Sequence, residues 1–246
     1  IDFHMNDSGV YITPASRGAS HTSRALARLD ENGAASYTFD IEWAPTAPIE
    51  VPSTAQIIEA GSISAIIEPG ASAVLDALAR GREHALIFFD PNARPSIMGE
   101  PAAALAALER FVALADVVKV SDEDIEWLTG GVPIDKVVNR WLGMGPSLVV
   151  VTRGKHGSNV ATASGLRFTK TTSDVKVVDT VGAGDSFMGG MIDAMWGMGL
   201  RGADAREALR TLPEEQVRAI IDRASAVSDV TVSRKGANPP WAHELS

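Results

Sequence analysis

The segment Asp179–Phe187, which reads DTVGAGDSF, decides how this chain folds. The residues before it, 175–178, are rich in valine and predict a strand, whereas apolar side chains recur at helical spacing after Gly184. The segment therefore predicts a strand, a glycine turn and the N-terminus of a helix over 183–196. The apolar stripe of that helix consists of Phe187, Met191, Ala194 and Met195.

The glycine turn is suited to binding an anion. Gly182 and Gly184 let the backbone approach a ligand closely, and the free N–H groups and positive dipole end of the following helix favour a phosphate or a developing negative charge. Asp185 stands inside that anion site. Its carboxylate can accept a proton from an attacking hydroxyl, or it can only complement the helix dipole in the first turn. These residues alone leave the two roles about equally favoured.

Composition narrows the class of protein. With 246 residues, 45% hydrophobic and 22% charged, the chain is typical of a globular domain. A net charge of -9 and a pI near 5.0 argue against a nucleic-acid partner, which would need a basic face. The chain has no cysteine, which excludes disulfides and thiolate chemistry and fits the cytoplasm. No apolar run approaches the roughly 20 residues of a membrane span, so no membrane partner is expected.

The N-terminal part carries a β-hairpin pattern. Residues 22–29 and 34–43 flank Asn32-Gly33, a pair that favours the tight turn of such hairpins. The second arm alternates apolar and polar side chains, so we expect a sheet covered on one side. Three prolines between residues 44 and 52 end strand pairing and predict a subdomain boundary near residue 50.

Beyond residue 50, short apolar runs alternate with amphipathic stretches, as in a parallel sheet with helices on both faces. The predicted fold is therefore a doubly wound α/β domain with a mostly parallel sheet and a small β-sheet lid. We expect strands at 57–58, 65–67, 85–89, 117–120 and 148–151, and a hairpin at 158–163 and 166–170. We expect helices at 71–80, 102–114, 122–128, 134–142, 183–196 and 214–228.

Five segments together resemble one known family. DTVGAGDSF resembles the C-terminal signature of the ribokinase-like sugar kinases, also called the phosphofructokinase-B family. Four further segments resemble other motifs of that family in the expected order. They are DPNARP at 90–95, Lys119–Asp124 against KxNxxE, Thr152–Gly157 against TxGxxG, and Arg234–Pro239 against RxGAxP. The resemblance covers essentially the whole chain and implies a ribokinase-like fold.

The resemblance also implies an activity. It indicates an ATP- and Mg²⁺-dependent phosphotransferase with an alcohol group of a sugar as acceptor. The pairing of DPNARP with the strand ASYTFDIEW, residues 35–43, is most similar to fructokinases, so fructose is the first expected acceptor. A 2-keto-3-deoxygluconate kinase or a nucleoside kinase of the same family is the alternative. A further alternative is a non-catalytic homologue that senses a nucleotide or a sugar.

Each matching position then receives an implied role. Asp185 corresponds to the catalytic base, which favours this role over that of a dipole partner. The backbone of Gly182, Ala183 and Gly184 corresponds to the anion hole. The implied ATP-binding residues are Thr152, Gly154, Gly157, Gly182, Gly184 and Ser225. Arg94 follows a strand end, where open parallel sheets bind ligands, and is expected to contact sugar or phosphate.

Two ion sites are implied as well. Asp179 and Val181 match positions that hold a monovalent cation in many members, here K⁺. Asp124 matches a position associated with magnesium, but Ser121 and Asp124 replace the asparagine and glutamate usual in the family. Ser-x-x-Asp before an apolar helical run is also a capping box, so a structural role competes with metal binding.

The N-terminus departs from the family pattern. Ile1-Asp2-Phe3 resembles the end of the first strand, whose aspartate binds sugar hydroxyls, so Asp2 is an expected substrate contact. The residues from His4 to Val10 match a later part of the pattern, and the GGxxxN signature is absent. We therefore expect residues 1–10 to be a remnant of the N-terminal part, with a stretch between residues 3 and 4 missing. Residues 11–50 are expected to form mainly a β-sheet lid that pairs two copies into a homodimer, and 51–246 the nucleotide-binding and catalytic domain.

Overall fold

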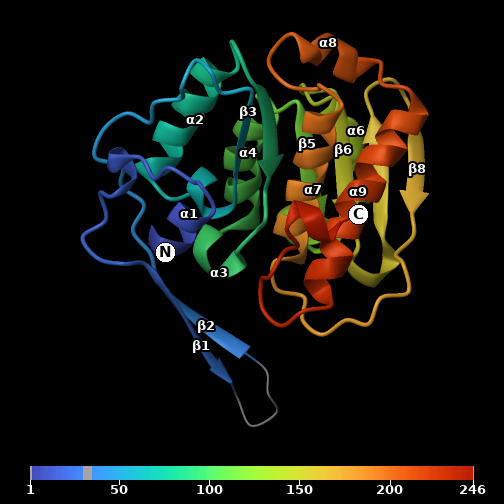
Figure 1. The fold of residues 1–246 in the computed structure, drawn as a ribbon. Coiled ribbons are helices and arrows are strands. Elements are labelled where there is room, and N and C mark those ends of the chain that lie inside the picture. The colour runs from blue at the N-terminus through green and yellow to red at the C-terminus, as the bar shows by residue number, and fades with distance from the viewer. Residues whose placement is uncertain (1, 30–34, 246) are drawn as a thin grey trace.

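The computed structural model describes residues 2–29 and 35–245, and its centre is a six-stranded sheet (Figure 1). The strand order is β3-β4-β5-β6-β7-β8, and the strands from β3 to β6 run parallel whereas β7 and β8 are antiparallel. The strands are β3 (Ile57–Gly61), β4 (Leu86–Asp90), β5 (Val117–Ser121), β6 (Leu148–Thr152), β7 (Ser158–Thr162) and β8 (Arg167–Lys170).

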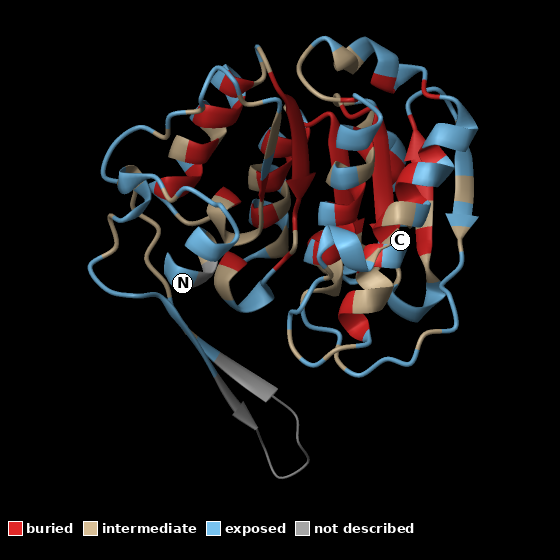
Figure 2. Ribbon diagram, viewed as in Figure 1, coloured by how far each residue is buried: buried red, intermediate tan, exposed pale blue. Residues whose placement is uncertain are grey.

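Helices cover both faces of this sheet. One face packs against α2 (Gly70–Gly81), α4 (Pro101–Val112), α5 (Asp122–Thr129) and α6 (Ile134–Leu142). The other face packs against α7 (Ala183–Gly197) and α9 (Glu214–Val232), which lie side by side. The described residues also form three short α-helices, which are α1 (Asp2–Asp7), α3 (Pro95–Met98) and α8 (Ala205–Arg210). The predicted layers are therefore confirmed, and the central strands are buried along their length (Figure 2).

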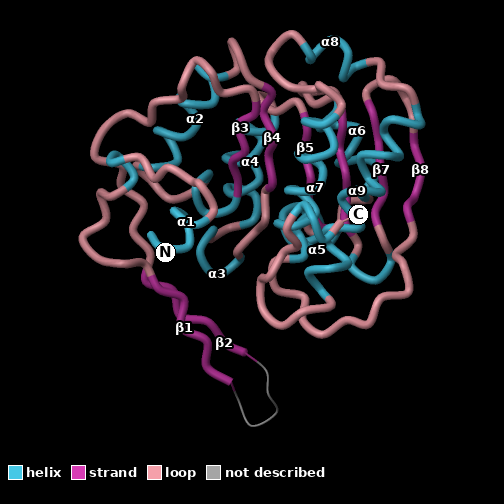
Figure 3. The backbone as a smooth tube through the Cα atoms, in the orientation of Figure 1, coloured by secondary structure: helices cyan, strands magenta, loops and turns pink. Residues whose placement is uncertain are grey.

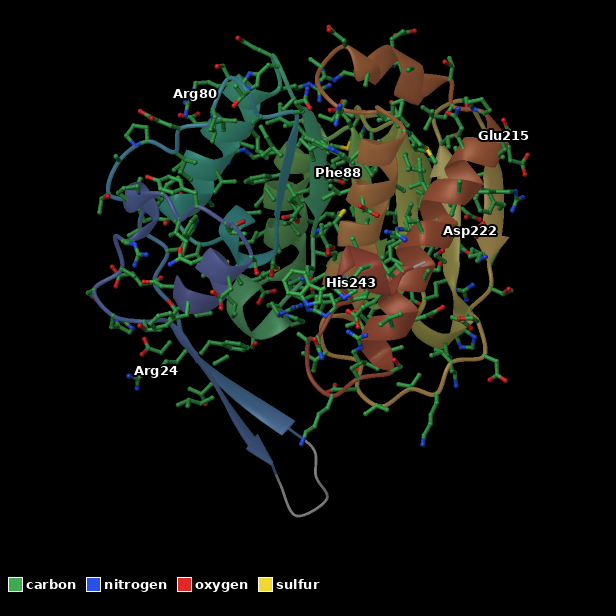
Figure 4. All side chains as sticks on the ribbon, viewed as in Figure 1. Arg24, Arg80, Phe88, Glu215, Asp222 and His243 are labelled. Carbon is green, nitrogen blue, oxygen red and sulfur yellow. The ribbon has the colours of Figure 1, made fainter. Side chains whose placement is uncertain are left out.

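Strand alternation decides which side chains face which helices. In β4, Leu86 and Phe88 pack against α7 and α9, whereas Ile87 and Phe89 pack into the opposite cluster. A strand that is buried on both faces has a continuous run of apolar residues in its sequence, and β4 has such a run from residue 86 to residue 89. Phe88 accordingly lies in the interior, whereas Glu215 and Asp222 lie on the exposed surface of α9 (Figure 4).

A separate two-stranded sheet projects from the body (Figure 3). It pairs β1 (Arg24–Leu29) with β2 (Ala35–Asp40) in antiparallel register, with Arg24 opposite Asp40. The predicted Asn32-Gly33 turn lies outside the described residues. Trp43, which follows β2, packs closely on α2, since a Cβ at Gly70 would lie 1.9 Å from its ring.

Two predicted strands are wrong. Ala65 ends a 3-10 helix, Ser62–Ala65, and residues 66–67 follow it; the chain turns there after β3 because Ala65 and Ile66 pack on the core. Residues 175–178 form an irregular segment beside the end of α9, where the N–H groups of Val178 and Asp179 donate to the Val232 carbonyl. A helix end offers one free carbonyl rather than a ladder of partners, so no strand forms there.

The N-terminal prediction is also corrected. Asp2 lies in helix α1 and not at the end of a strand, and it pairs with Arg17. The short helices α1, α3 and α8 were not predicted, since each has too few turns to show a clear apolar period. Within residues 2–29 and 35–245, no helix is both long and apolar enough to cross a membrane.

Candidate active site

The candidate site lies where the parallel strands end. The loops that leave β4, β5 and β6 at their carboxyl ends meet the first turn of α7. Open α/β sheets bind their ligands at this edge, because the loops diverge there and helix N-termini point toward the opening. Three features share this location: a cavity, the glycine turn, and the loop from Asp90 to Arg94.

The cavity brings together five of the six residues predicted to bind ATP, whereas the sixth, Gly182, lines a second pocket together with Asp185. Its volume is about 140 Å³, and one wall is the turn after β6, with Thr152, Gly154 and Gly157. Gly184 of α7 forms one end, and Ser225 of α9 lies on another wall. The Ser225 hydroxyl donates to the Ile221 carbonyl at 2.8 Å, so that oxygen offers its lone pairs to a ligand. Sequence reasoning had not named the cavity residues Thr171, Thr172, Ser228 and Asp229.

The backbone conformation and the close packing of the glycine turn both restrict substitution at Gly182. Gly182 caps α7 with φ at 78°, a left-handed conformation that favours glycine. A Cβ there would also lie 2.9 Å from the Ala237 side chain. The Ser228 hydroxyl of α9 donates to the Ala183 carbonyl at 3.2 Å, and this hydrogen bond ties the turn to α9. The Ala183 N–H donates to the Thr180 carbonyl at 3.2 Å, which closes the turn itself.

Asp185 lies in the first turn of α7 with its side chain exposed. Asn92 Nδ2 donates to Asp185 Oδ1 at 3.4 Å, and Arg94 Nη1 donates to Asn92 Oδ1 at 2.6 Å. Asn92 has a φ of 37°, a left-handed conformation that asparagine tolerates better than most residues. The three side chains form one chain of hydrogen bonds that ends on the carboxylate of Asp185. Asn92 was missed as a site residue, although the DPNARP motif contained it.

Arg94 is engaged within its own loop. Besides Asn92 Oδ1, its guanidinium donates to the carbonyls of Asn92 at 3.2 Å and of Ala93 at 2.9 Å. In this structure Arg94 therefore orients Asn92, and its side chain remains exposed.

Asp124 forms the capping box that the sequence suggested as an alternative to metal binding. The Ser121 hydroxyl accepts from the Asp124 N–H at 3.0 Å, and Asp124 Oδ2 accepts from the Ser121 N–H at 3.3 Å. Asp124 Oδ1 accepts from the Ala93 N–H at 3.0 Å, which ties the β4 loop to α5. Within the described parts of the chain, no three acidic or histidine side chains are grouped as a metal centre.

Asp179 ties the glycine turn to the segment after α9. Its carboxylate accepts from the N–H groups of Val181 at 3.0 Å and Gly236 at 2.9 Å. These backbone hydrogen bonds hold the pKa of Asp179 below its ordinary value. Val181 is exposed and presents no side-chain oxygen. Asp2, the other predicted contact, is exposed in α1, and its hydrogen bond and ion pair with Arg17 lower its pKa.

A buried ion pair lies deeper in the site. Lys119 Nζ of β5 is 2.8 Å from Asp90 Oδ2 of β4, and each residue is 4% exposed. Burial raises the pKa of Asp90, and the charge of Lys119 opposes this rise. Desolvation of the Glu59 carboxyl on β3 raises its pKa to about 7; the charges of Asp90 and Asp185 add to the rise, and that of Lys119 opposes it. The sequence indicated no role for Asp90 or Glu59, because these contacts join separate strands.

A mostly parallel sheet between two helical layers, with a glycine turn and a carboxylate at the edge where the parallel strands end, is the arrangement of the ribokinase-like fold. The fructokinase from Xylella fastidiosa with bound ATP has this fold, with a TM-score of 0.80 and 26% identity over 96% of this chain and 76% of that one. The fructokinase from Vibrio cholerae in a fructose-, ADP- and calcium-bound form has a TM-score of 0.72 and 27% identity over 96% and 75% of the two chains.

The family description "pfkB family carbohydrate kinase" matches residues 1–244, so the chain belongs to that family. The predicted family and fold are both confirmed. A fructokinase from Rhizobium leguminosarum bv. trifolii is 34% identical over 197 residues, which make up 78% of this chain. The match spans 60% of that relative's length.

Proposed function

We propose that this chain carries the catalytic machinery of an ATP-dependent sugar kinase, a phosphotransferase with an alcohol group as acceptor. One observation carries the proposal: the first turn of α7 places Gly184 against the cavity beside the turn after β6 and exposes Asp185 one residue later. A phosphoryl donor and the base that activates its acceptor would therefore meet at a single helix N-terminus.

The roles of the residues follow from this arrangement. Asp185 accepts the proton of the attacking sugar hydroxyl, and the hydrogen bond from Asn92 holds its carboxylate in place. The N–H groups of the Gly182–Gly184 turn stabilise the negative charge on the transferred phosphoryl group. Thr152, Gly154, Gly157 and Ser225 hold the nucleotide. Arg94 keeps Asn92 directed at the base.

The residues present fit a nucleotide better than they fit a resident metal. Glycines and a helix N-terminus line the cavity end that would receive phosphates. Both oxygens of Asp124 already accept backbone hydrogen bonds, so we propose that Mg²⁺ enters with the phosphates of ATP, as is usual for this ion. Bound Mg²⁺ would neutralise phosphate charge. Asp179 and the Val181 backbone are the proposed K⁺ position, although the Asp179 carboxylate already bonds two N–H groups.

Fructose is the proposed acceptor, because the relatives at 33–34% identity and the two solved structures described above are named as fructokinases. An aminoimidazole riboside kinase from Salmonella enterica is also similar in structure, with a TM-score of 0.75 and 25% identity, so a nucleoside belongs in the test. The test is a panel of fructose, glucose, ribose, 2-keto-3-deoxygluconate and adenosine with ATP, read as ADP release. We expect release with fructose well above the rate without acceptor. Release with another member of the panel would move the assignment to that acceptor, and binding of ATP without release with any of them would indicate a sensor.

The β1–β2 hairpin is the proposed dimer contact and lid. Leu26 is exposed on it, and within the described residues the hairpin stands away from the body (Figure 1). A lid that closes over the site would keep water from competing with the sugar hydroxyl. We expect sedimentation velocity to give a dimer that Leu26→Glu converts to a monomer. A monomeric native protein would contradict this proposal.

A further inference from the structure

The buried pair of Asp90 and Lys119 lies on the same side of the sheet as the glycine turn. Phe88 and Val117 belong to the cluster that packs against α7 and α9. Asp90 and Lys119 each follow one of these residues by two positions, and side chains two apart in a strand share a face. Both charged groups are therefore directed toward α7 at the carboxyl end of the sheet.

The ammonium of Lys119 lies directly beneath the turn. A Cβ placed on Gly184 would be 2.7 Å from Lys119 Nζ and 3.7 Å from its Cε. Apart from its two chain neighbours and the backbone of its own helix, no other atom of the described residues, Asp90 included, comes within 4 Å of that position. The pair thus presents its positive end to the Gly184 backbone and its negative end away from it.

Asp90 holds this cation in place. Its Oδ2 is 2.8 Å from Lys119 Nζ, and within the described residues its buried Oδ1 has no hydrogen-bond partner. Burying two charges costs more than their attraction commonly returns, so such a pair is weak as a source of stability. Its charge acts strongly on its surroundings, however, because water does not screen it there.

We propose that Lys119, oriented by Asp90, is a positioning residue of the anion hole. Its ammonium lies under Gly184, fixes the turn and makes the local potential positive where the phosphoryl group is transferred. Lys119 does not line the nucleotide cavity, so it acts through the turn and not by contact with the nucleotide. This inference rests on the proposed kinase function.

The test is a double-mutant cycle of Lys119→Met and Gly184→Ala, with the rate measured on fructose and ATP. Gly184 has helical backbone geometry and alanine favours helices, so the Gly184→Ala variant should fold. Its added methyl group should lower the rate because it displaces the Lys119 ammonium. We expect each single variant to lower kcat by roughly 10- to 100-fold, less than the roughly 10²- to 10³-fold loss for one oxyanion-hole donor because Lys119 acts through the turn, with the KM for ATP changed by less than about threefold. The double variant should be no slower than Lys119→Met alone.

Gly189→Ala is the matched control. Gly189 lies in the same helix, and a Cβ there would meet nothing within 4 Å, so its kcat should equal that of the native protein. Losses that multiply in the double variant would overturn the inference, since the new methyl would then obstruct the phosphates directly. An unchanged kcat in Lys119→Met would overturn it as well.

A binding measurement separates this inference from the kinase assignment. Aluminium fluoride with ADP imitates a phosphoryl group in transfer, so calorimetry should show that fluoride tightens ADP binding to the native protein. Gly184→Ala and Lys119→Met should bind ADP alone normally and lose most of this tightening. If Lys119→Met does not fold, Gly184→Ala still decides the outcome, and retained tightening there overturns the inference. A native protein with this tightening but no sugar turnover would contradict the proposed function alone.

Discussion

Asp185 takes its proposed role from its two neighbours. On one side the N–H groups of the α7 N-terminus favour its negative charge, and on the other Asn92 Nδ2 donates to its carboxylate. An ionised, oriented carboxylate can accept a proton when a hydroxyl attacks. A residue that served only the helix dipole would not need the hydrogen bond from a loop 93 residues away in sequence.

Asp185→Asn tests this role directly. Asparagine keeps the shape of the side chain but cannot take up the proton, so we expect kcat for sugar phosphorylation to fall by about 10²- to 10⁴-fold. ADP affinity, measured by calorimetry, should stay within about threefold, because the cavity residues are unchanged. A variant that kept most of its rate would remove Asp185 from the mechanism.

At the scale of elements, α7 and α9 are the helices that hold the site together. Gly190 allows their close approach, since a Cβ there would lie 2.7 Å from the Ala224 Cα. Across the same helix turn, Gly189 faces open space. Two adjacent glycines therefore serve different purposes, and only one of them is a packing requirement.

Gly190→Ala and Gly189→Ala form a matched pair of variants. The first forces two backbones apart, and we expect it to lower the free energy of unfolding by about 1–3 kcal/mol. The second gains the helix preference of alanine without a clash and should raise that energy by up to about 1 kcal/mol. Urea denaturation measures both. Equal effects of the two substitutions would contradict the packing of α7 against α9.

The elements also show how far sequence reasoning reaches. Helices α2, α4, α5, α6, α7 and α9 and the strands of the large sheet were predicted, because their apolar patterns record local geometry. Residues 175–178 have a strand-like composition, yet their neighbour in space is a helix end, which no local pattern reveals. The hydrogen bond from Asn92 to Asp185 and the burial of Lys119 beneath Gly184 depend on pairing between distant segments, and only the assembled sheet defines them.

At the scale of the whole molecule, negative charge gathers in the site. The chain has a net charge of -9, and Glu59, Asp90 and Asp185 influence one another across three elements, with Lys119 as the opposing charge. Like charges that lie near one another favour the protonated form of one of them. In this site Glu59 is that group: desolvation is the main cause of its raised pKa of about 7, and the charges of Asp90 and Asp185 add to it.

The raised pKa of Glu59 predicts a pH dependence of stability. Between its ordinary value of 4.5 and about 7, the folded protein binds more protons at Glu59 than the unfolded chain, so its contribution is full below 4.5 and lost as pH rises through 7. Water screens the exposed side chain, so the effect should be smaller than the full shift would give. Glu59→Gln should therefore match the native urea midpoint near pH 4.5 and exceed it at pH 8. A constant difference between the two proteins across this range would contradict the raised pKa.

Two contacts of the segment after α9 hold the glycine turn. The Gly236 N–H donates a hydrogen bond to the Asp179 carboxylate, and Ala237 lies against Gly182. These contacts have a consequence for the order of events during biosynthesis. A ribosome makes the sheet strands and the glycine turn before it makes the segment after α9 that fixes that turn. Domains of this kind fold as units. A nascent chain should therefore gain a rigid turn at Gly182 only after residue 237 has left the exit tunnel, so the proposed anion hole should form later than the sheet that carries it.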